Sequence, residues 1–255
     1  MTYLRAFFHL AAYAFRRQLR SRKVLLGIIL LAMLAAVVLL ISIKTSWNAR
    51  MFGEFVVLRM LGLFFLPVIT LMFGTAALGD ERDEKSLVYV LTRPLPRWAI
   101  YVGKFLGVLP IVLVFTLGSL YFLHALAAWN GRPDLRDSIG AYVPAVFYGS
   151  LASVAFFHLL TVFFRHSTLI AIAYVFFIEV FIGEVPGILK RISLRFYTSS
   201  MIYDSAKPFG LTPPRREIFL PLDGDTARWC LAGATVVLLL LGCWAFARRD
   251  QHQAA

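Results

Sequence analysis

Long apolar runs and shorter charged segments alternate along this chain of 255 residues. The first run, residues 24–43, holds 20 residues without a charge, and a helix of that length crosses about 30 Å of hydrocarbon at roughly 1.5 Å per residue. Comparable runs follow, so the pattern predicts an all-α polytopic membrane protein with six transmembrane helices. The predicted spans are residues 24–43, 55–78, 100–128, 142–164, 168–182 and 229–247.

The segment 1–23 has a different pattern from these spans. Leu4, Phe7 and Ala11 recur at helical spacing, and arginines occupy other positions and the end of the segment. A basic amphipathic helix of this kind lies in the membrane interface with its apolar face toward the acyl chains. We therefore expect an N-terminal interfacial helix over 1–23.

The longest polar stretch is 183–228, which is rich in Pro and Arg and precedes the last span. We expect it to form an outer, extracytoplasmic loop region. Ile188, Leu189, Ile192 and Phe196 share a helical face, which predicts a short surface helix within it. A shorter polar loop is expected over 129–141, and the whole chain 1–255 is interpreted as a single membrane domain.

The distribution of basic residues predicts the orientation. Six spans place both termini on one side, together with the segment 79–104 and the turn at Arg165. Leaving 183–228 aside, that side carries 14 Lys and Arg residues and the other side five. Because cytoplasmic loops carry an excess of Lys and Arg, we expect both termini in the cytoplasm and the protein in the cell's inner membrane.

The composition agrees with a membrane protein. Hydrophobic residues make up 60% of the chain and charged residues 16%, whereas a soluble domain has about 25% charged residues. The net charge is +12, but the basic residues flank the spans. Anionic lipid headgroups therefore explain them better than nucleic acid does, and no nucleic-acid partner is expected.

The segment 79–86 is one residue from a phosphate-binding loop, with Glu84 where the second glycine belongs. Such a loop wraps phosphate in bare backbone amides after a buried strand. Here the acids of the segment would repel phosphate, and a membrane helix precedes it. We expect no enzymatic activity, cofactor or metal in this chain.

Glu179 is the carboxylate predicted to lie deepest in the apolar runs. An intramembrane acid is a functional candidate by default, so Glu179 is a possible pathway residue. The alternative is an acid that packs helices or snorkels near the outer interface. His124 and His158 are expected to be hydrogen-bonded packing residues.

The segment 79–104 is charged, interrupted by Pro94 and Pro96, and lies between two apolar spans. Acids and bases in such density cannot lie in hydrocarbon, so the segment must face water close to the bilayer. Positive charge alone would be enough to set the topology. The acids Asp80, Glu81 and Asp83 therefore favour a contact with a partner over a solvated loop, which is the alternative interpretation.

This segment resembles the signature of type-2 ABC exporter permeases (ABC-2 type). The residues that carry the resemblance are Glu81–Leu87, Leu91–Arg97 and the pair Gly103–Lys104, which match an ERExGT-like helix, an LSRPxSR-like turn and the start of the third span. Asp83 replaces the usual Glu, Lys85 the usual Gly, and Pro96 a Ser. The nearest subgroup by resemblance is the permeases of copper-enzyme maturation exporters.

The resemblance implies that a coupling helix docks in a groove of a separate ATPase subunit. Charged side chains would give orientation at such a contact, and the leucines and valine would fill an apolar slot. The short turn at Arg165 and His166 is a possible minor contact. The implied coupling residues are Asp80, Glu81, Arg82, Asp83, Glu84, Lys85, Leu87, Val88, Leu91, Arg93 and Arg97.

The resemblance also implies the assembly. Two cytosolic ABC ATPase subunits would bind ATP and Mg, and a second permease copy or a homologue would complete the pore, with a periplasmic partner possible at the outer loop. The function so implied is the permease subunit of an ATP-driven exporter. A secondary carrier, or a membrane anchor or signalling subunit that does not transport, remains the alternative.

Overall fold

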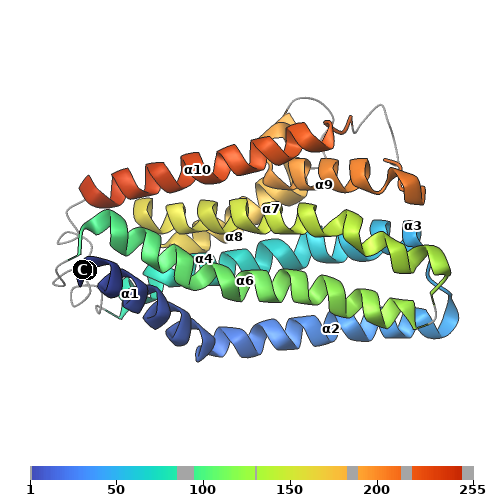
Figure 1. Cartoon of the computed structure of the whole chain (residues 1–255), viewed down its shortest axis with the longest axis horizontal. Coiled ribbons are helices and arrows are strands. Elements are labelled where there is room, and N and C mark those ends of the chain that lie inside the picture. Colours follow the sequence, from blue (N-terminus) through green and yellow to red (C-terminus); the bar gives the residue numbers. More distant parts are fainter. Residues whose placement is uncertain (1, 85–94, 130, 183–188, 214–219, 249–255) are drawn as a thin grey trace.

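The computed structural model describes residues 2–84, 95–129, 131–182, 189–213 and 220–248 (Figure 1). Within these ranges every regular element is a helix, and Trp47 and Gly131 form an isolated β-bridge. The elements in chain order are α1 (Thr2–Leu19), α2 (Arg22–Lys44), α3 (Ala49–Met51), η1 (Phe52–Phe65), α4 (Leu66–Asp83), α6 (Arg97–Ala128), α7 (Pro133–Phe163), α8 (Ser167–Tyr174), η2 (Val175–Ile182), η3 (Leu189–Ile192), α9 (Leu194–Ser205), η4 (Lys207–Phe209) and α10 (Gly224–Arg248).

Five described helices are long and apolar enough to cross a membrane: Arg22–Lys44, Ala49–Asp83, Arg97–Ala128, Pro133–Phe163 and Gly224–Arg248. The all-α class predicted from the sequence is thus confirmed. The predicted fifth span corresponds to α8 and η2, an apolar helix described as Ser167–Phe181. That helix reaches only about 22 Å at 1.5 Å per residue, less than the hydrocarbon thickness of about 30 Å. A sixth span therefore stays a prediction.

The long helices lie side by side, with α2 and α10 on opposite edges of the view and α6 and α7 between them (Figure 1). The edge helices expose large apolar side chains, such as Leu26 and Met33 on α2 and Leu240 on α10. Lipid tails are as apolar as these side chains, so such faces are stable in a bilayer.

The polar segment 129–141 was predicted as a loop, but the chain is helical from Pro133 onward. Proline is favoured at the first helical position because its missing amide and fixed φ cost nothing there. Asp134 follows in the first turn, where a negative charge is favourable, and Leu135 is fully buried. A favourable first turn and one buried apolar side chain therefore extend α7 beyond the apolar run.

The region 183–228 was predicted as an outer loop, and its described part requires a correction. It contains α9, which packs against α7 and lies alongside α10 (Figure 1). Phe196, Met201 and Ile202 of α9 are buried, while Leu189 and Ile192 of the preceding η3 are exposed. Ile188 of the predicted surface helix lies outside the described residues. The other three positions divide between η3 and α9, so the prediction of one surface helix over them was wrong.

The second long helix, Ala49–Asp83, is wound as a π-helix over η1 and as an α-helix over α4. The change coincides with Pro67, which lies at the start of α4. Proline has no amide to donate and clashes with the preceding turn, so the regular hydrogen-bond pattern cannot continue through it. The Thr70 hydroxyl donates to the Leu66 carbonyl at 2.7 Å in the first turn of α4.

Helix α1 is packed onto the beginning of α6. Leu10 and Ala14 of α1 are buried, and a Cβ atom added at Gly107 of α6 would lie 2.6 Å from the Ala14 Cβ and 2.7 Å from the Ala11 carbonyl oxygen. The close approach of the two helices therefore requires glycine at 107.

We predict that Gly107→Val separates α1 from α6 and destabilises the protein, because the new side chain meets backbone that cannot move away. Overpacking of this kind costs about 1–3 kcal/mol, which thermal unfolding of the purified protein in detergent will measure as a lower Tm. Gly118→Val is the matched control, since Gly118 lies on the same helix and a Cβ there meets nothing within 4 Å. Equal Tm values for both variants would contradict the packing.

Candidate functional site

The charged residues after the second long span form the last turn of α4. Asp80, Glu81 and Asp83 lie within the helix, and Glu84 is its C-cap residue. Acids are unfavourable at this position because the C-terminal end of a helix carries partial negative charge. Their stability depends on cations that other elements supply.

Glu81 is the buried member of this turn, with 2% of its side chain exposed. Its Oε1 atom accepts from the ammonium of Lys104 on α6, whose side chain is 1% exposed. The Arg17 guanidinium on α1 donates to the same oxygen at 2.7 Å. Two cations thus compensate the buried carboxylate, as burial of a charge requires.

Asp80 and Glu84 form ion pairs nearer the surface. The Lys23 ammonium, at the start of α2, lies 2.7 Å from the Asp80 carboxylate. Arg17 also donates to Glu84 at 2.6 Å, so its planar fork bridges two acids of one helix turn. Burial works to lower the pKa of Arg17, but Glu81 and Glu84 raise it and the net direction is upward. Arg17 therefore stays cationic.

Arg82 of the same turn reaches the end of α7. Its guanidinium donates to the Thr161 carbonyl at 2.9 Å and to the Arg165 carbonyl at 2.6 Å. Carbonyls at the end of a helix have no partner within the helix, so Arg82 satisfies acceptors where α7 ends. We call the set Arg17, Lys23, Asp80, Glu81, Arg82 and Lys104 the charged junction; it joins the end of α4 to α1, α2, α6 and α7.

The structure brings the predicted minor contact close to the predicted coupling segment. Arg165 and His166 are exposed in the turn after α7, next to Arg82, and Asp83 and Glu84 are exposed on α4. Arg97 starts α6 and donates to the Ala247 carbonyl on α10 at 3.3 Å. Five predicted coupling residues lie outside the described residues: Lys85, Leu87, Val88, Leu91 and Arg93.

Composition and helical periodicity do not pair the cations of the charged junction with the acids of α4. Arg17 and Lys23 were assigned to the membrane interface, and Lys104 entered only as part of a motif. Lys104 was the one indication of this pairing in the sequence, because it is a cation inside an apolar run. A buried ammonium requires a carboxylate nearby.

Glu179 of η2 caps helix α9. Its carboxylate accepts from the Ser193 hydroxyl at 2.6 Å and from the Leu194 and Arg195 amides at 3.2 and 3.0 Å. The recess beside it has a volume of about 10 Å³, room for roughly one water molecule. This geometry favours the packing role of Glu179 over a contact with a substrate.

The buried histidines have backbone partners. The Nε2 atom of His158 lies 3.2 Å from the Tyr101 carbonyl oxygen, and that of His124 lies 2.8 Å from the Leu135 carbonyl oxygen. Among the described residues, no group of His, Cys, Asp or Glu side chains is placed to hold a metal ion.

Comparison with known proteins identifies the family. A family model described as "ABC-2 family transporter protein" matches residues 9–251, nearly the whole chain and all of the charged junction. A comparison with curated proteins found no match. The match agrees with several apolar helices long enough to span a membrane. This integral membrane protein therefore belongs to the ABC-2 family of transporter proteins and is a permease.

Proposed function

We propose that this permease is the membrane subunit of an ATP-driven exporter and that a separate ATPase docks at the end of α4. The observation that carries the proposal is the charged junction. A force applied to the end of α4 would act on α1, α2, α6 and α7 together, because ion pairs and charge-assisted hydrogen bonds join them. Such bonds are about twice as strong as neutral ones.

The proposal assigns different roles to surface and buried residues. The residues that are exposed at this end of the bundle, and so available to a partner, are Asp83, Glu84, Arg165 and His166. Glu81 and Lys104 are buried and would transmit a displacement between α4 and α6. The proposal therefore removes the buried Glu81 from the docking surface predicted from the sequence and keeps the exposed residues.

The family supports the following proposal for the assembly. The docking end would face the cytoplasm, where two ATPase subunits bind ATP and Mg, and two permease chains would form the transport path. The inner membrane, the export direction and membership of the copper-enzyme maturation subgroup belong to this proposal. Transport that is driven by an ion gradient and needs no ATPase would favour a secondary carrier instead.

We predict that Asp83→Lys weakens ATPase binding without destabilising the permease. Asp83 is exposed, and a reversed charge at a docking surface opposes the partner's field at a cost of several kcal/mol. Tagged permease will be purified from its native membranes, and ATP hydrolysis in the eluate will be measured. We expect a loss of about tenfold or more, since 1.4 kcal/mol corresponds to tenfold.

The matched control is Asp137→Lys, which reverses an exposed acid near the start of α7, at the other end of the bundle. We expect this variant to retain the hydrolysis of the wild-type eluate. Retention of ATPase by Asp83→Lys, or its equal loss from both variants, would overturn the assigned docking surface.

We predict that Glu81→Gln destabilises the permease itself, because Lys104 keeps its buried charge and loses its carboxylate. Breaking a buried ion pair from one side costs about 3–5 kcal/mol, which chemical or thermal unfolding will detect. The double variant Glu81→Met, Lys104→Met should recover much of the lost stability, since it leaves no buried charge between α4 and α6. A double variant less stable than Glu81→Gln would contradict this interpretation.

A further inference from the structure

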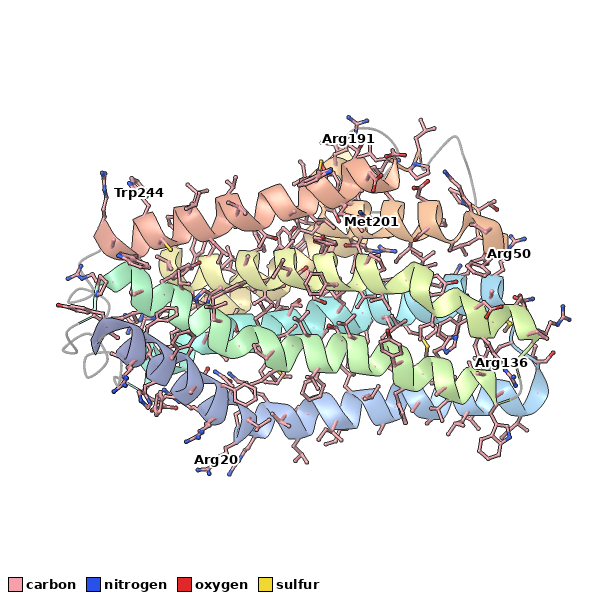
Figure 2. All side chains as sticks on the ribbon, viewed as in Figure 1. Arg20, Arg50, Arg136, Arg191, Met201 and Trp244 are labelled. Atoms are coloured by element: carbon pink, nitrogen blue, oxygen red, sulfur yellow. The ribbon has the colours of Figure 1, made fainter. Side chains whose placement is uncertain are left out.

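A second group of charged residues lies at the end of the bundle opposite the charged junction. Figure 2 labels Arg50 and Arg136 at this end, far from Arg20 and Trp244. Here the end of α2 and the start of the second long helix surround a recess of about 380 Å³. The recess is lined by Ile41, Asn48, Arg50, Met51, Glu54, Phe55 and Arg59.

The backbone beneath this recess is held in place by hydrogen bonds. The Asn48 side chain accepts from the Met51 amide at 2.7 Å and caps the helix. The Asp134 carboxylate accepts from the Ala49 amide at 2.9 Å, and the Arg132 amide donates to the Trp47 carbonyl at 2.7 Å. The recess is therefore preformed, as ligand sites usually are.

The lining of the recess has an excess of positive charge. Arg50 donates from Nε to Glu54 at 2.9 Å, which neutralises one arginine. Arg59 is exposed, and within the part of the chain that the structure describes no carboxylate pairs with it. One net positive charge thus faces the recess.

The position of Arg59 makes this charge costly without an anion. Arg59 lies ten residues into a helix of 35 residues that begins at Ala49, or at most about 15 Å from its start at 1.5 Å per residue. An arginine within the membrane part of a helix is unfavourable unless its charge reaches water or an anion. Snorkelling of the Arg59 side chain toward water reduces that cost. Snorkelling alone would not explain why Arg59 and a second arginine, Arg50, line the same recess.

We propose that this recess binds the phosphate headgroup of an anionic phospholipid. Arg59 and Arg50 donate to the phosphate, since guanidinium forks match phosphate geometry, and Glu54 orients Arg50. Ile41, Met51 and Phe55 supply an apolar wall for the glycerol and the first methylenes of the lipid. The volume lies within the range of about 300–1,000 Å³ found for small-molecule sites. The inference concerns the permease chain alone and does not depend on an ATPase.

Lipid binding to the purified full-length chain tests this proposal. Native mass spectrometry in detergent will count phosphatidylglycerol retained per chain, with phosphatidylcholine as the competing zwitterionic lipid. We expect the wild-type protein to retain phosphatidylglycerol preferentially. Arg59→Gln should weaken its binding about tenfold or more, which corresponds to about 1.4 kcal/mol, because a charge-assisted hydrogen bond to the phosphate is lost.

Two further variants separate the site from general charge effects. Arg136→Gln removes an exposed arginine at the same end that does not line the recess, and it should bind phosphatidylglycerol like the wild type. Glu54→Gln keeps an oxygen that can accept from Arg50 but removes the negative charge that opposes the phosphate, so it should bind phosphatidylglycerol more tightly than the wild type.

Several outcomes would overturn the proposal. One is equal retention of phosphatidylglycerol by the wild type and Arg59→Gln, and another is equal loss in Arg136→Gln. Free glycerol phosphate is the test for a soluble phosphate source. If it displaces phosphatidylglycerol at comparable concentrations, the apolar wall contributes nothing and the lipid assignment fails.

Discussion

Burying a carboxylate costs several kcal/mol unless cations or hydrogen-bond donors surround it, and that constraint on Glu81 arranges one end of this permease. Lys104 and Arg17 must approach the same oxygen, so α6 and α1 must meet where α4 ends. The close contact of α1 with Gly107 brings α1 to the beginning of α6, not far from Lys104. Packing and electrostatics therefore support the same arrangement of helices.

Two buried carboxylates in this fold are stabilised in different ways. Glu81 is compensated by cations of other helices, whereas Glu179 accepts hydrogen bonds from a hydroxyl and from amides at the start of α9. A helix N-terminus carries partial positive charge, which suits a carboxylate without a full counter-ion. The first arrangement connects helices at the end of the bundle, and the second fixes η2 against α9. The recess beside Glu179 has room for roughly one water molecule.

One helix connects the two charged ends of the molecule. Ala49–Asp83 carries Arg59 and the proposed lipid recess near its start and the charged junction at its end. Its winding changes at Pro67, between these two regions. π-helical segments occur frequently at functional sites. A displacement of the charged junction would therefore reach the opposite end through a helix whose hydrogen-bond pattern is already irregular at its middle.

The sequence by itself determined the class of the protein. Uninterrupted apolar runs fix long membrane helices, because every backbone polar group must be satisfied inside hydrocarbon. The charged turn after the second span was recognisable for the same reason, since Asp80 and Glu81 could not lie among lipid tails. Segments with mixed composition were predicted less well. Helix α7 starts at Pro133, and α9 packs against α7 and α10. In both segments, burial of a few apolar side chains against neighbouring helices outweighs the polar average composition of the segment.

Only the tertiary structure decided which residues meet. Arg17, Lys23 and Lys104 are far from the acids of α4 in sequence, and helical periodicity gives no information on contacts between helices. The same holds for Arg82, whose partners on α7 are carbonyl groups that every residue carries. Composition and periodicity indicate whether a segment suits lipid, water or the protein interior. The partners of a charge depend on how the helices pack, and packing is a property of the whole chain.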